Sequence, residues 1–379
     1  MDLEAVYRDL HAHPELSFAE HRTAAVAAAH LRALGLEVTE GVAGTGVVGL
    51  LRNGDGPTVL LRADMDALPV TEDTGLAYAS VEPGVMHACG HDVHVTCLMG
   101  AVQELVGDRD AWRGTLMAVF QPAEEGAGGA AAMLADGLFE RFGTPDVCLG
   151  QHVAPLPAGV LAYCPGVAFA ASDSIRIVLH GRGGHGSRPE TTVDPVLMAA
   201  SLVLRLQTIV SREVAATESA VVTVGALHAG TRGNIIPDDA ELLLSVRSFD
   251  PGVRDRVHAA IDRLARGEAA AAGADRAPEL TVQHAFPLTV NEPEATERVA
   301  EGFRAAGLTV VPIGPASGSE DFGLFGAAAG VPSVFWLLGG GERDSNHSPR
   351  FAPDIHPTLE IGVAALANAA KTYFFQITR

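Results

Sequence analysis

Four short apolar runs in this 379-residue chain each lead into acidic residues or histidine, and this pattern limits the folds open to the chain. Short apolar runs bounded by turn residues are typical of strands in the interior of a sheet. Open α/β sheets place their functional side chains beyond the carboxyl ends of such strands. We therefore expect an α/β catalytic domain with a central mixed sheet and a functional site at one sheet edge. The runs and the residues that follow them are 59–63 with Asp64 and Asp66, 114–120 with Glu124 and Glu125, 147–150 with His152, and 333–338 with His347.

A dense group of coordinating side chains lies between the first two runs. Residues 87–94 contain three histidines, a cysteine and an aspartate, and the apolar helical run 95–106 follows directly. Thiolate and imidazole groups are good ligands for zinc and its first-row neighbours. Cys89 and His91 can reach one metal from a tight turn that enters the helix. The alternative interpretation is a polar helix start that contains a buried cysteine.

The two glutamates at the end of the second run also favour a metal site. Adjacent carboxylates that leave a buried strand are costly unless each has a partner. Glu125 bound to a metal and Glu124 held beside it as a base would satisfy this requirement, whereas two exposed loop glutamates are the alternative. Asp64 and Asp66 can likewise be turn residues, and a lone histidine such as His152 is often structural. The candidate ligands are Cys89, His91, Glu125, His152 and His347.

This mixed ligand set is large enough for two divalent metal ions, which in two-metal sites lie about 3.5–4 Å apart. Bound metal lowers the pKa of a water towards about 7, and Glu124 would take the proton of that water. The sulfur, nitrogen and oxygen ligands are compatible with zinc, manganese, cobalt or nickel, so the identity of the metal stays open. The expected reaction is metal-assisted hydrolysis of a carbonyl derivative.

The middle of the chain has the pattern of a separate module. Its β-α-β-β-α-(β) order predicts a ferredoxin-like α+β domain over residues 166–283. This module is inserted into a catalytic domain formed by residues 1–165 and 284–379. The second helix of the module is expected to begin at Asp250 and to end near Gly267.

Residues 181–186 match the dinucleotide-binding pattern G-x-G-x-x-G and follow a predicted strand. That pattern requires a helix that begins directly at the phosphates. Here Pro189 and a polar run intervene before a helix begins at Asp194, which is a good N-cap residue. We therefore reject a dinucleotide site.

Composition excludes several classes of protein. The net charge of −20 would repel the phosphates of nucleic acid. No apolar stretch approaches the roughly 18 residues that a membrane span requires, and the start of the chain lacks a basic and apolar leader. The four cysteines have no paired pattern, which fits a reducing compartment. We expect a cytoplasmic protein that binds neither nucleic acid nor membrane.

Motifs along the whole chain, in a fixed order, resemble the M20 metallopeptidase clan. Within that clan they look like the amidohydrolase branch of hippurate hydrolases and of auxin-conjugate or N-acyl-amino-acid amidohydrolases. Several motifs are weak alone, but together they are highly specific. The matching segments are His11 to Glu20, Arg62 to Pro69, Met86 to Asp92, Phe120 to Glu125, Gly181 to Gly186, Asn234 to Asp238, Ser319 to Phe322 and His347 to Pro349.

The resemblance implies a role for each residue of the metal site. Cys89 would bridge two metals, and Glu124 would be the general base that activates water and then protonates the leaving amine. Asp66 would orient a neighbouring metal ligand. Val93 stands where this branch usually has glycine, which affects the shape of the pocket beside the helix start but removes no ligand. The ligands that complete the two metal shells would be His91, Glu125, His152 and His347.

The resemblance also implies that the inserted module is a lid and a dimerisation domain. His185 would approach the active site of the other subunit in a homodimer and polarise the scissile carbonyl oxygen. Asn234 and Arg247 would contact the substrate or its carboxylate.

The leading hypothesis is therefore a dinuclear metal-dependent amidohydrolase that cleaves the amide bond of N-acyl amino acids, such as hippurate-like or N-acetyl conjugates. The same centre could support a metallo-dipeptidase or carboxypeptidase, because the motifs do not encode recognition of the acyl group. A non-catalytic metal-binding relative is the third hypothesis, and the presence of Glu124 beside every ligand argues against it.

Overall fold

The computed structural model describes residues 1–126 and 128–376, which form two compact units. Unit 2 contains Phe169–Leu288 together with the short segment Ala316–Ser319, and unit 1 contains the other described residues. We expected the inserted module to span residues 166–283. The structure moves these boundaries by a few residues and adds a second, short crossing of the chain into unit 2.

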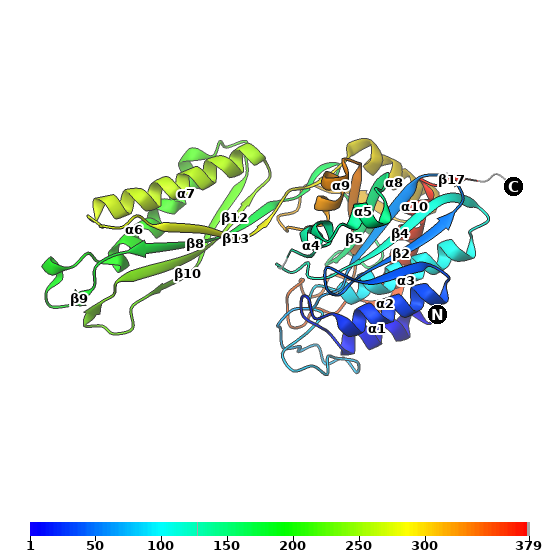
Figure 1. The fold of residues 1–379 in the computed structure, drawn as a ribbon, viewed down its shortest axis with the longest axis horizontal. Helices are drawn as coiled ribbons and strands as arrows, with labels where there is room; N and C mark the ends of the chain where they lie inside the picture. The colour runs from blue at the N-terminus through cyan, green and yellow to red at the C-terminus, as the bar shows by residue number, and fades with distance from the viewer. Residues whose placement is uncertain (127, 377–379) are drawn as a thin grey trace. The chain divides into compact units, whose positions relative to one another are not determined.

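A nine-stranded sheet forms the centre of unit 1 (Figure 1). Its strands are β1 (Glu37–Val42), β2 (Gly46–Asn53), β3 (Thr58–Asp64), β4 (Trp112–Gln121), β5 (Val147–Ala154), β6 (Leu161–Tyr163), β15 (Val310–Pro312), β16 (Ser333–Gly339) and β17 (Phe375–Gln376), while β7 (Gly166–Phe169) pairs separately with β14 (Thr289–Asn291). The order is β1-β2-β4-β3-β5-β16-β6-β15, with β17 paired to β4. β4, β3, β5 and β16 are consecutive and parallel, whereas β1, β2 and β17 pair antiparallel. The sheet is therefore mixed, which confirms the expected α/β class.

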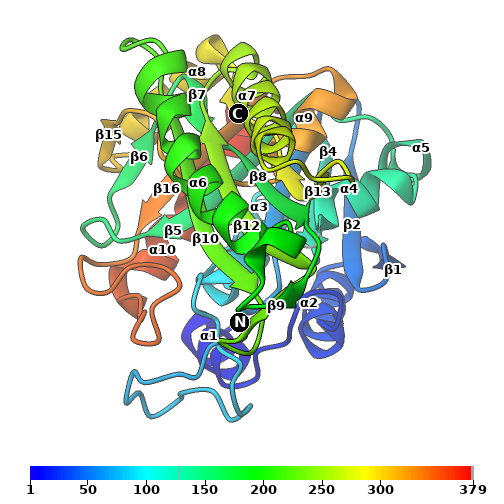
Figure 2. The same ribbon diagram turned by 90° about the vertical axis from the view of Figure 1, so that its left-hand side faces the viewer.

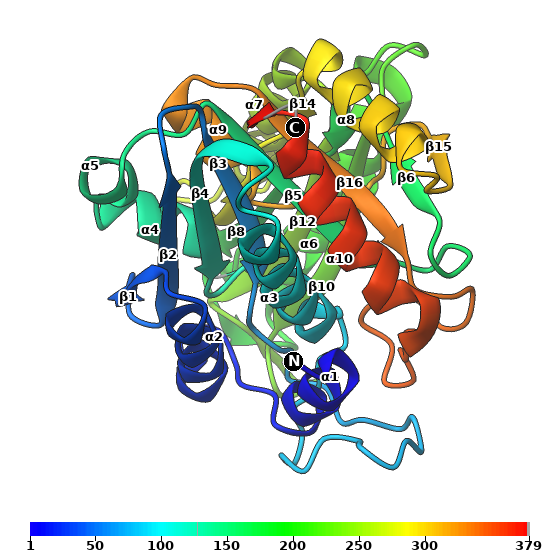
Figure 3. The same cartoon turned by 90° about the vertical axis from the view of Figure 1, so that its right-hand side faces the viewer.

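Helices cover both faces of this sheet. They are α1 (Leu3–Ala12), α2 (His21–Ala33), α3 (His91–Gly107), α4 (Gly129–Ala135), α5 (Leu138–Phe142), α8 (Pro293–Ala305), α9 (Gly323–Ala329) and α10 (Ile355–Lys371). α3 and α10 lie side by side on one face, and α9 contacts β5 and β16 on the other (Figure 3). The side chains of Val95, Leu98 and Val102 are all buried in α3, because α1, α2, α10 and the sheet surround this helix. This packing fixes the start of α3 at the sheet edge.

Unit 2 is a four-stranded antiparallel sheet with two helices on one face (Figure 2). Its elements are β8 (Ala171–His180), β9 (Gly184–His185), a 3-10 turn (Pro189–Thr191), α6 (Pro195–Thr208) with a π-helical end (Ile209–Glu213), β10 (Ala220–Ala229), β11 (Ile235–Ile236), β12 (Asp239–Ser248), α7 (Pro251–Ala271) and β13 (Glu279–Phe286). The order β10-β12-β8-β13 is that of a ferredoxin-like module. Ile177, Leu202 and Ile261 are fully buried where the sheet and the helices pack.

The end of α7 differs from our expectation of a stop near Gly267. The helix continues to Ala271 and stops at Gly273, whose φ is +70°. The N–H of Gly273 donates to the carbonyl oxygen of Ala270 at 3.1 Å. A glycine inside a helix costs only about 1 kcal/mol, so Gly267 is tolerated, whereas the left-handed position at the end favours glycine.

Among the described residues, no helix has the length and apolar character needed to cross a membrane. The four cysteines are free thiols, and all four are buried.

Candidate metal centre

The carboxyl ends of four parallel strands meet at one edge of the unit 1 sheet. Asp64 ends β3 and Gln121 ends β4, while His152 lies near the end of β5. The loop that follows β16 leads to His347. Because parallel neighbours end at the same edge of a sheet, residues that are far apart in the sequence lie together there.

A tight turn brings Cys89 and His91 to the same edge. Gly90 lies between them with a φ of +82°, and α3 begins at His91. A Cβ atom at position 90 would lie 2.3 Å from Cγ1 of Val153. Glycine fits both the positive φ and this close approach, so Gly90 determines how the two candidate ligands face β5.

The five candidate ligands form two overlapping groups. Donor atoms of Cys89, His91 and His152 all lie within 4.8 Å of one another, and so do those of Cys89, Glu125 and His347. The Sγ atom of Cys89 lies 3.4 Å from Nε2 of His152. Nε2 of His347 lies 3.2 Å from Oε1 of Glu125. Cys89 belongs to both groups, so a thiolate at this position can contact two ions.

Hydrogen bonds leave ligand atoms of this site free for a cation. Nδ1 of His91 lies 3.2 Å from Oδ1 of Asp66, and Nδ1 of His152 donates to the carbonyl oxygen of Val153 at 2.7 Å. These bonds put each ring proton on Nδ1, so that Nε2 presents a lone pair. Within the described part of the chain, Nε2 of His91 is buried without a hydrogen-bond partner. Such an unsatisfied atom costs about 1–3 kcal/mol, and a divalent metal ion fits this donor set.

Asp66 organises the centre without belonging to either group. Its carboxylate accepts hydrogen bonds from the ring of His91 and from Oγ of Ser17, at 3.2 and 2.7 Å. It also accepts the backbone N–H groups of Glu124 and Glu125, both at 3.0 Å. Burial raises the pKa of Asp66, but the hydrogen bonds from His91 and Ser17 lower that pKa overall. The carboxylate therefore stays ionised and orients the ring of His91.

Glu124 lies beside the candidate ligands in a buried, acidic environment. It offers a carboxylate oxygen within 4.8 Å of donor atoms of His91 and Glu125, and another such group joins it to Glu320 and Asp321. Burial raises the pKa of Glu124 well above its ordinary value, and the carboxylates of Glu320 and Asp321 raise it further. A carboxylate with a raised pKa binds a proton more readily, as a general base requires.

Arg62, to which we assigned no role from the sequence, lies at the centre of a buried ion-pair network. Its guanidinium donates to Asp64 at 2.6 Å, to Glu320 at 2.8 Å and to Asp321 at 3.1 Å. The sequence feature that could have indicated this role is the position of Arg62 inside the apolar run 59–63. A charged residue that is buried in a sheet needs partners of opposite charge. The bonds from Arg62 hold the carboxylates that surround the base.

His94 and Asn346 support the centre and were also missed. Nδ1 of His94 lies 2.5 Å from Oδ1 of Asp64, and its Nε2 accepts the N–H of Val153 at 2.7 Å. Both ring nitrogens are therefore used, which makes His94 structural. The side-chain amide of Asn346 donates to the carbonyl oxygens of Cys89 and Val153, each at 3.2 Å. The one sequence signal for Asn346 was its position directly before a candidate ligand.

Unit 2 carries the remaining predicted residues at two separate places. β9 pairs with β11, and Gly186 donates its N–H to the carbonyl oxygen of Asn234 at 2.9 Å, so Asn234 lies beside His185. Arg247 lies near the far end of β12, roughly 26 Å along that strand from its start at the usual rise per residue. There its guanidinium donates to a carbonyl and a hydroxyl oxygen of segment Ala316–Ser319 at 3.1 and 3.0 Å. The three residues thus do not form one cluster within unit 2.

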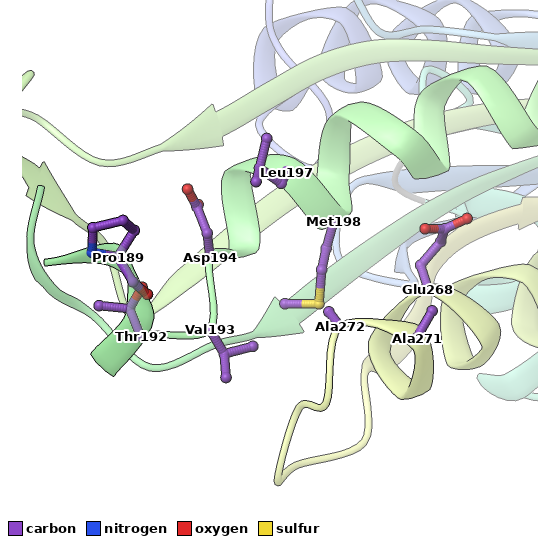
Figure 4. A pocket seen from close by; sticks show the side chains of 9 residues that line it. All are labelled: Pro189, Thr192, Val193, Asp194, Leu197, Met198, Glu268, Ala271 and Ala272. Atoms are coloured by element: carbon purple, nitrogen blue, oxygen red, sulfur yellow. The ribbon is translucent and has the colours of Figure 1, made fainter.

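A surface pocket of about 450 Å³ opens elsewhere in unit 2, where the start of α6 approaches the end of α7 (Figure 4). Leu197 and Met198 line it from α6, and Glu268 lines it from α7. None of the described residues that line this pocket belongs to the predicted site. This pocket is therefore separate from the candidate metal centre, which lies at the sheet edge of unit 1.

The fold and the candidate ligand groups fit a metal-dependent hydrolase, and comparison with known proteins identifies the family. Residues 60–372 match peptidase family M20/M25/M40, and the chain belongs to this family. It is therefore a metal-dependent hydrolase that acts on amide or peptide bonds. The similarity to a hippurate hydrolase, given below, confirms the resemblance to the amidohydrolase branch.

Two relatives and one solved structure are similar to this chain over most of its length. Hippurate hydrolase of Campylobacter jejuni is 42% identical over 329 residues, which cover 86% of this chain and 85% of that protein. Thermostable carboxypeptidase 1 of Saccharolobus solfataricus is 38% identical over 378 residues, covering 97% and 94%. The crystal structure of a Bacillus subtilis protein, described as a dinuclear metal-binding peptidase of family M20, has a TM-score of 0.82 at 32% identity. It covers 98% of this chain and 96% of that chain.

Proposed function

We propose that this protein is a dinuclear metal-dependent amidohydrolase that cleaves the amide bond of N-acyl amino acids, such as hippurate-like or N-acetyl conjugates. The observation that carries the proposal is the pair of overlapping ligand groups that share Cys89, with Glu124 buried beside them. The similarity to a hippurate hydrolase supports the substrate class. The products are a free amino acid and a carboxylic acid.

Each candidate ligand is assigned to one or both ions. Cys89 would serve both ions, His91 and His152 would hold one, and Glu125 and His347 would hold the other. When bound, two ions of zinc, manganese, cobalt or nickel would lower the pKa of a water and polarise the scissile carbonyl group. The buried, unsatisfied Nε2 atom of His91 supports this assignment, because a cation would satisfy it.

Glu124 is the general base. Its carboxylate takes a proton from the attacking water, whose oxygen bonds to the carbonyl carbon. The buried, acidic surroundings that raise its pKa let it keep this proton until the C–N bond breaks. It then gives the proton to the leaving amine, so that one water is divided between the two products. Asp66 acts through His91, whose ring it orients.

Unit 2 is assigned the roles of lid and dimerisation domain in a homodimer. Leu197 and Leu204 on α6 are 70% and 73% exposed. β10, which contacts α6, lies at the edge of its sheet and exposes Val221. Exposed apolar side chains next to an edge strand are typical of interfaces. This surface therefore supports the association of two subunits.

His185 is assigned a hydrogen bond to the scissile carbonyl oxygen in the active site of the other subunit. Its Nδ1 accepts the backbone N–H of Ser187 at 3.1 Å, which puts the ring proton on Nε2. An Nε2–H group can donate to an oxygen that gains negative charge during the reaction. Asn234 beside it, and Arg247 at the substrate carboxylate, are assigned on the resemblance to the family.

A metallo-dipeptidase or carboxypeptidase is the second candidate, because a 38% identical relative is a carboxypeptidase. Either activity has a small-molecule or short-peptide substrate. We also propose a cytoplasmic location, which the four free thiols support.

Hydrolysis of a panel of N-acetyl and N-benzoyl amino acids, measured beside dipeptides, tests the proposal. We expect the acyl conjugates to release free amino acid, a chelator to abolish the release, and added metal to restore it. Cleavage of dipeptides alone would replace the proposal by the second candidate. A metal-loaded protein that cleaves neither class would contradict both.

A further inference from the structure

Two buried carboxylates bind three successive backbone N–H groups in the segment that carries the base and one candidate ligand. Asp66 accepts the N–H groups of Glu124 and Glu125. The N–H of Ala123, the residue before them, donates to Oε1 of Glu20 at 2.9 Å. Asp66 has a role through His91, but nothing in the proposed reaction explains the presence of Glu20.

The backbone at Ala123 explains why this bond matters. Ala123 has a φ of +53°, in the left-handed region. For a residue with a Cβ atom this conformation costs about 1–2 kcal/mol, so it persists only where the surroundings impose it. The carbonyl group of Ala123 is fixed as well as its N–H group, because Gly129 donates its N–H to this carbonyl oxygen at 2.9 Å. A Cβ atom at Gly129 would lie 1.6 Å from the carbonyl oxygen of Pro122, so the two backbone segments are in close contact.

Glu20 is itself held rigidly. Its side chain is fully buried. Oε1 also accepts the backbone N–H of Phe18 at 2.9 Å, and Oε2 accepts the hydroxyl of Thr45 at 2.5 Å. A carboxylate that is fixed by these donors can fix the position of the N–H group of Ala123 in turn.

We propose that Glu20 is a positioning residue for catalysis, which holds Ala123 in the left-handed conformation and so sets the direction in which Glu124 faces the candidate metal ligands. The proposal rests on the proposed function of Glu124 as the base. Glu20 touches neither substrate nor metal ligand in this account and acts only through the backbone. Displacement of a reacting group by about 1 Å can cost about 100-fold in rate.

The test compares Glu20 with Glu15, a carboxylate of the same loop. Glu15 accepts the backbone N–H groups of Arg22 and Thr23 at 2.9 and 2.8 Å and thus stabilises the first turn of α2. kcat, KM and bound metal are measured at saturating metal for Glu20→Ala, Glu20→Gln and Glu15→Ala. We expect Glu20→Ala to lower kcat about 10- to 100-fold with little change in KM or bound metal. Glu20→Gln keeps an oxygen that accepts the N–H of Ala123, so it retains most of the kcat.

Glu15→Ala is expected to lower the melting temperature but to leave kcat unchanged. A Glu20→Ala variant with normal kcat, or a Glu15→Ala variant with an equal loss, would overturn the proposal. Glu124→Gln is measured alongside. If it remains active, the proposed base itself is wrong. If it is inactive while Glu20→Ala is fully active, only the positioning role is wrong.

A second substitution tests whether the conformation of residue 123 carries the effect. Glycine adopts the left-handed region without penalty, so Ala123→Gly should restore part of the kcat in the Glu20→Ala background. A loss of kcat without this recovery would overturn the proposal.

If Glu20→Ala does not fold, Ala123→Val in the otherwise intact chain replaces it, because a β-branched residue resists the left-handed region. Equal kcat values for Ala123→Val and Ala123→Gly would then contradict the account.

Discussion

Arg62 places one positive charge among three buried carboxylates in the interior of unit 1. Asp64, Glu320 and Asp321 all accept hydrogen bonds from its guanidinium, and all four side chains are buried. The removal of one partner from a buried ion pair leaves an uncompensated charge, which is costly. Arg62 therefore holds Glu320 and Asp321, two of the carboxylates that surround the proposed base.

We expect Arg62→Leu to lower the free energy of unfolding by about 3–5 kcal/mol. Arg52→Leu is the matched control, because Arg52 lies on β2 of the same sheet and forms an exposed ion pair with Glu37. Exposed pairs contribute about 0–1 kcal/mol. Urea-induced unfolding of both variants measures the two values. Similar small losses in both variants would show that Arg62 is not needed for stability.

The types of residue in the site could be predicted from the sequence, but their contacts could not. Cys89, Glu125 and His347 carry a local signal, because each type is a good metal ligand and each follows a strand or a tight turn. The partners of Arg62 carry none, since Glu320 lies 258 positions further along the chain. The left-handed backbone at Ala123 was also invisible, because it results from contacts with distant segments.

Asp173 joins two elements of unit 2, the strand β8 and the helix α7. It accepts two hydrogen bonds from Arg254, at 2.7 and 2.6 Å, and its Oδ2 lies 2.9 Å from Nε2 of His258. Burial alone would raise the pKa of Asp173, but the bonds from Arg254 and His258 lower this pKa to about 2. An unfolded aspartate has a pKa of about 3.9.

Because the folded pKa lies below the unfolded pKa, Asp173 contributes stability that is fully present above about pH 4. This contribution is lost as the pH falls towards 2. We expect Asp173→Asn to lower the free energy of unfolding of the protein by about 1–3 kcal/mol at pH 7. The difference from the wild type should shrink between about pH 4 and about pH 2. Thermal or urea unfolding across this range measures it, and a difference independent of pH would contradict the ionised pair.

Element starts were predictable where a capping residue marks them. Asp194 accepts the N–H of Val196 at the start of α6, and Asp250 accepts that of Val253 at the start of α7. The three-residue strands β6 and β15 were not predicted, because three residues show no periodicity. The crossing of segment Ala316–Ser319 into unit 2 depends on tertiary contacts and has no local signal.

At the scale of the whole molecule, the proposed homodimer can be tested by complementation. His185 would act in the site of the other subunit, whereas Glu124 would act in its own. A mixed dimer of one His185→Ala and one Glu124→Ala subunit would therefore contain one complete site. Each variant alone should be nearly inactive, and co-expression should restore about a quarter of the wild-type activity, since half of the dimers are mixed.

Size-exclusion chromatography and mass spectrometry of differently tagged subunits establish that mixed dimers form. Confirmed mixed dimers without activity would place His185 in its own subunit's site or outside the reaction. A monomeric protein with full activity would remove the dimer from the account.

The most direct test of the central claim is one measurement on the Glu124→Ala variant, in which bound metal and turnover are determined on the same sample. The candidate ligands Cys89, His91, Glu125, His152 and His347 are intact in this variant, so we expect it to bind two divalent ions per chain, the number that we also expect for the wild type. Turnover of an N-acyl amino acid should fall by about 10²–10⁴-fold, the usual contribution of a general base. Near-normal turnover, or the loss of metal together with activity, would contradict the division between ligands and base.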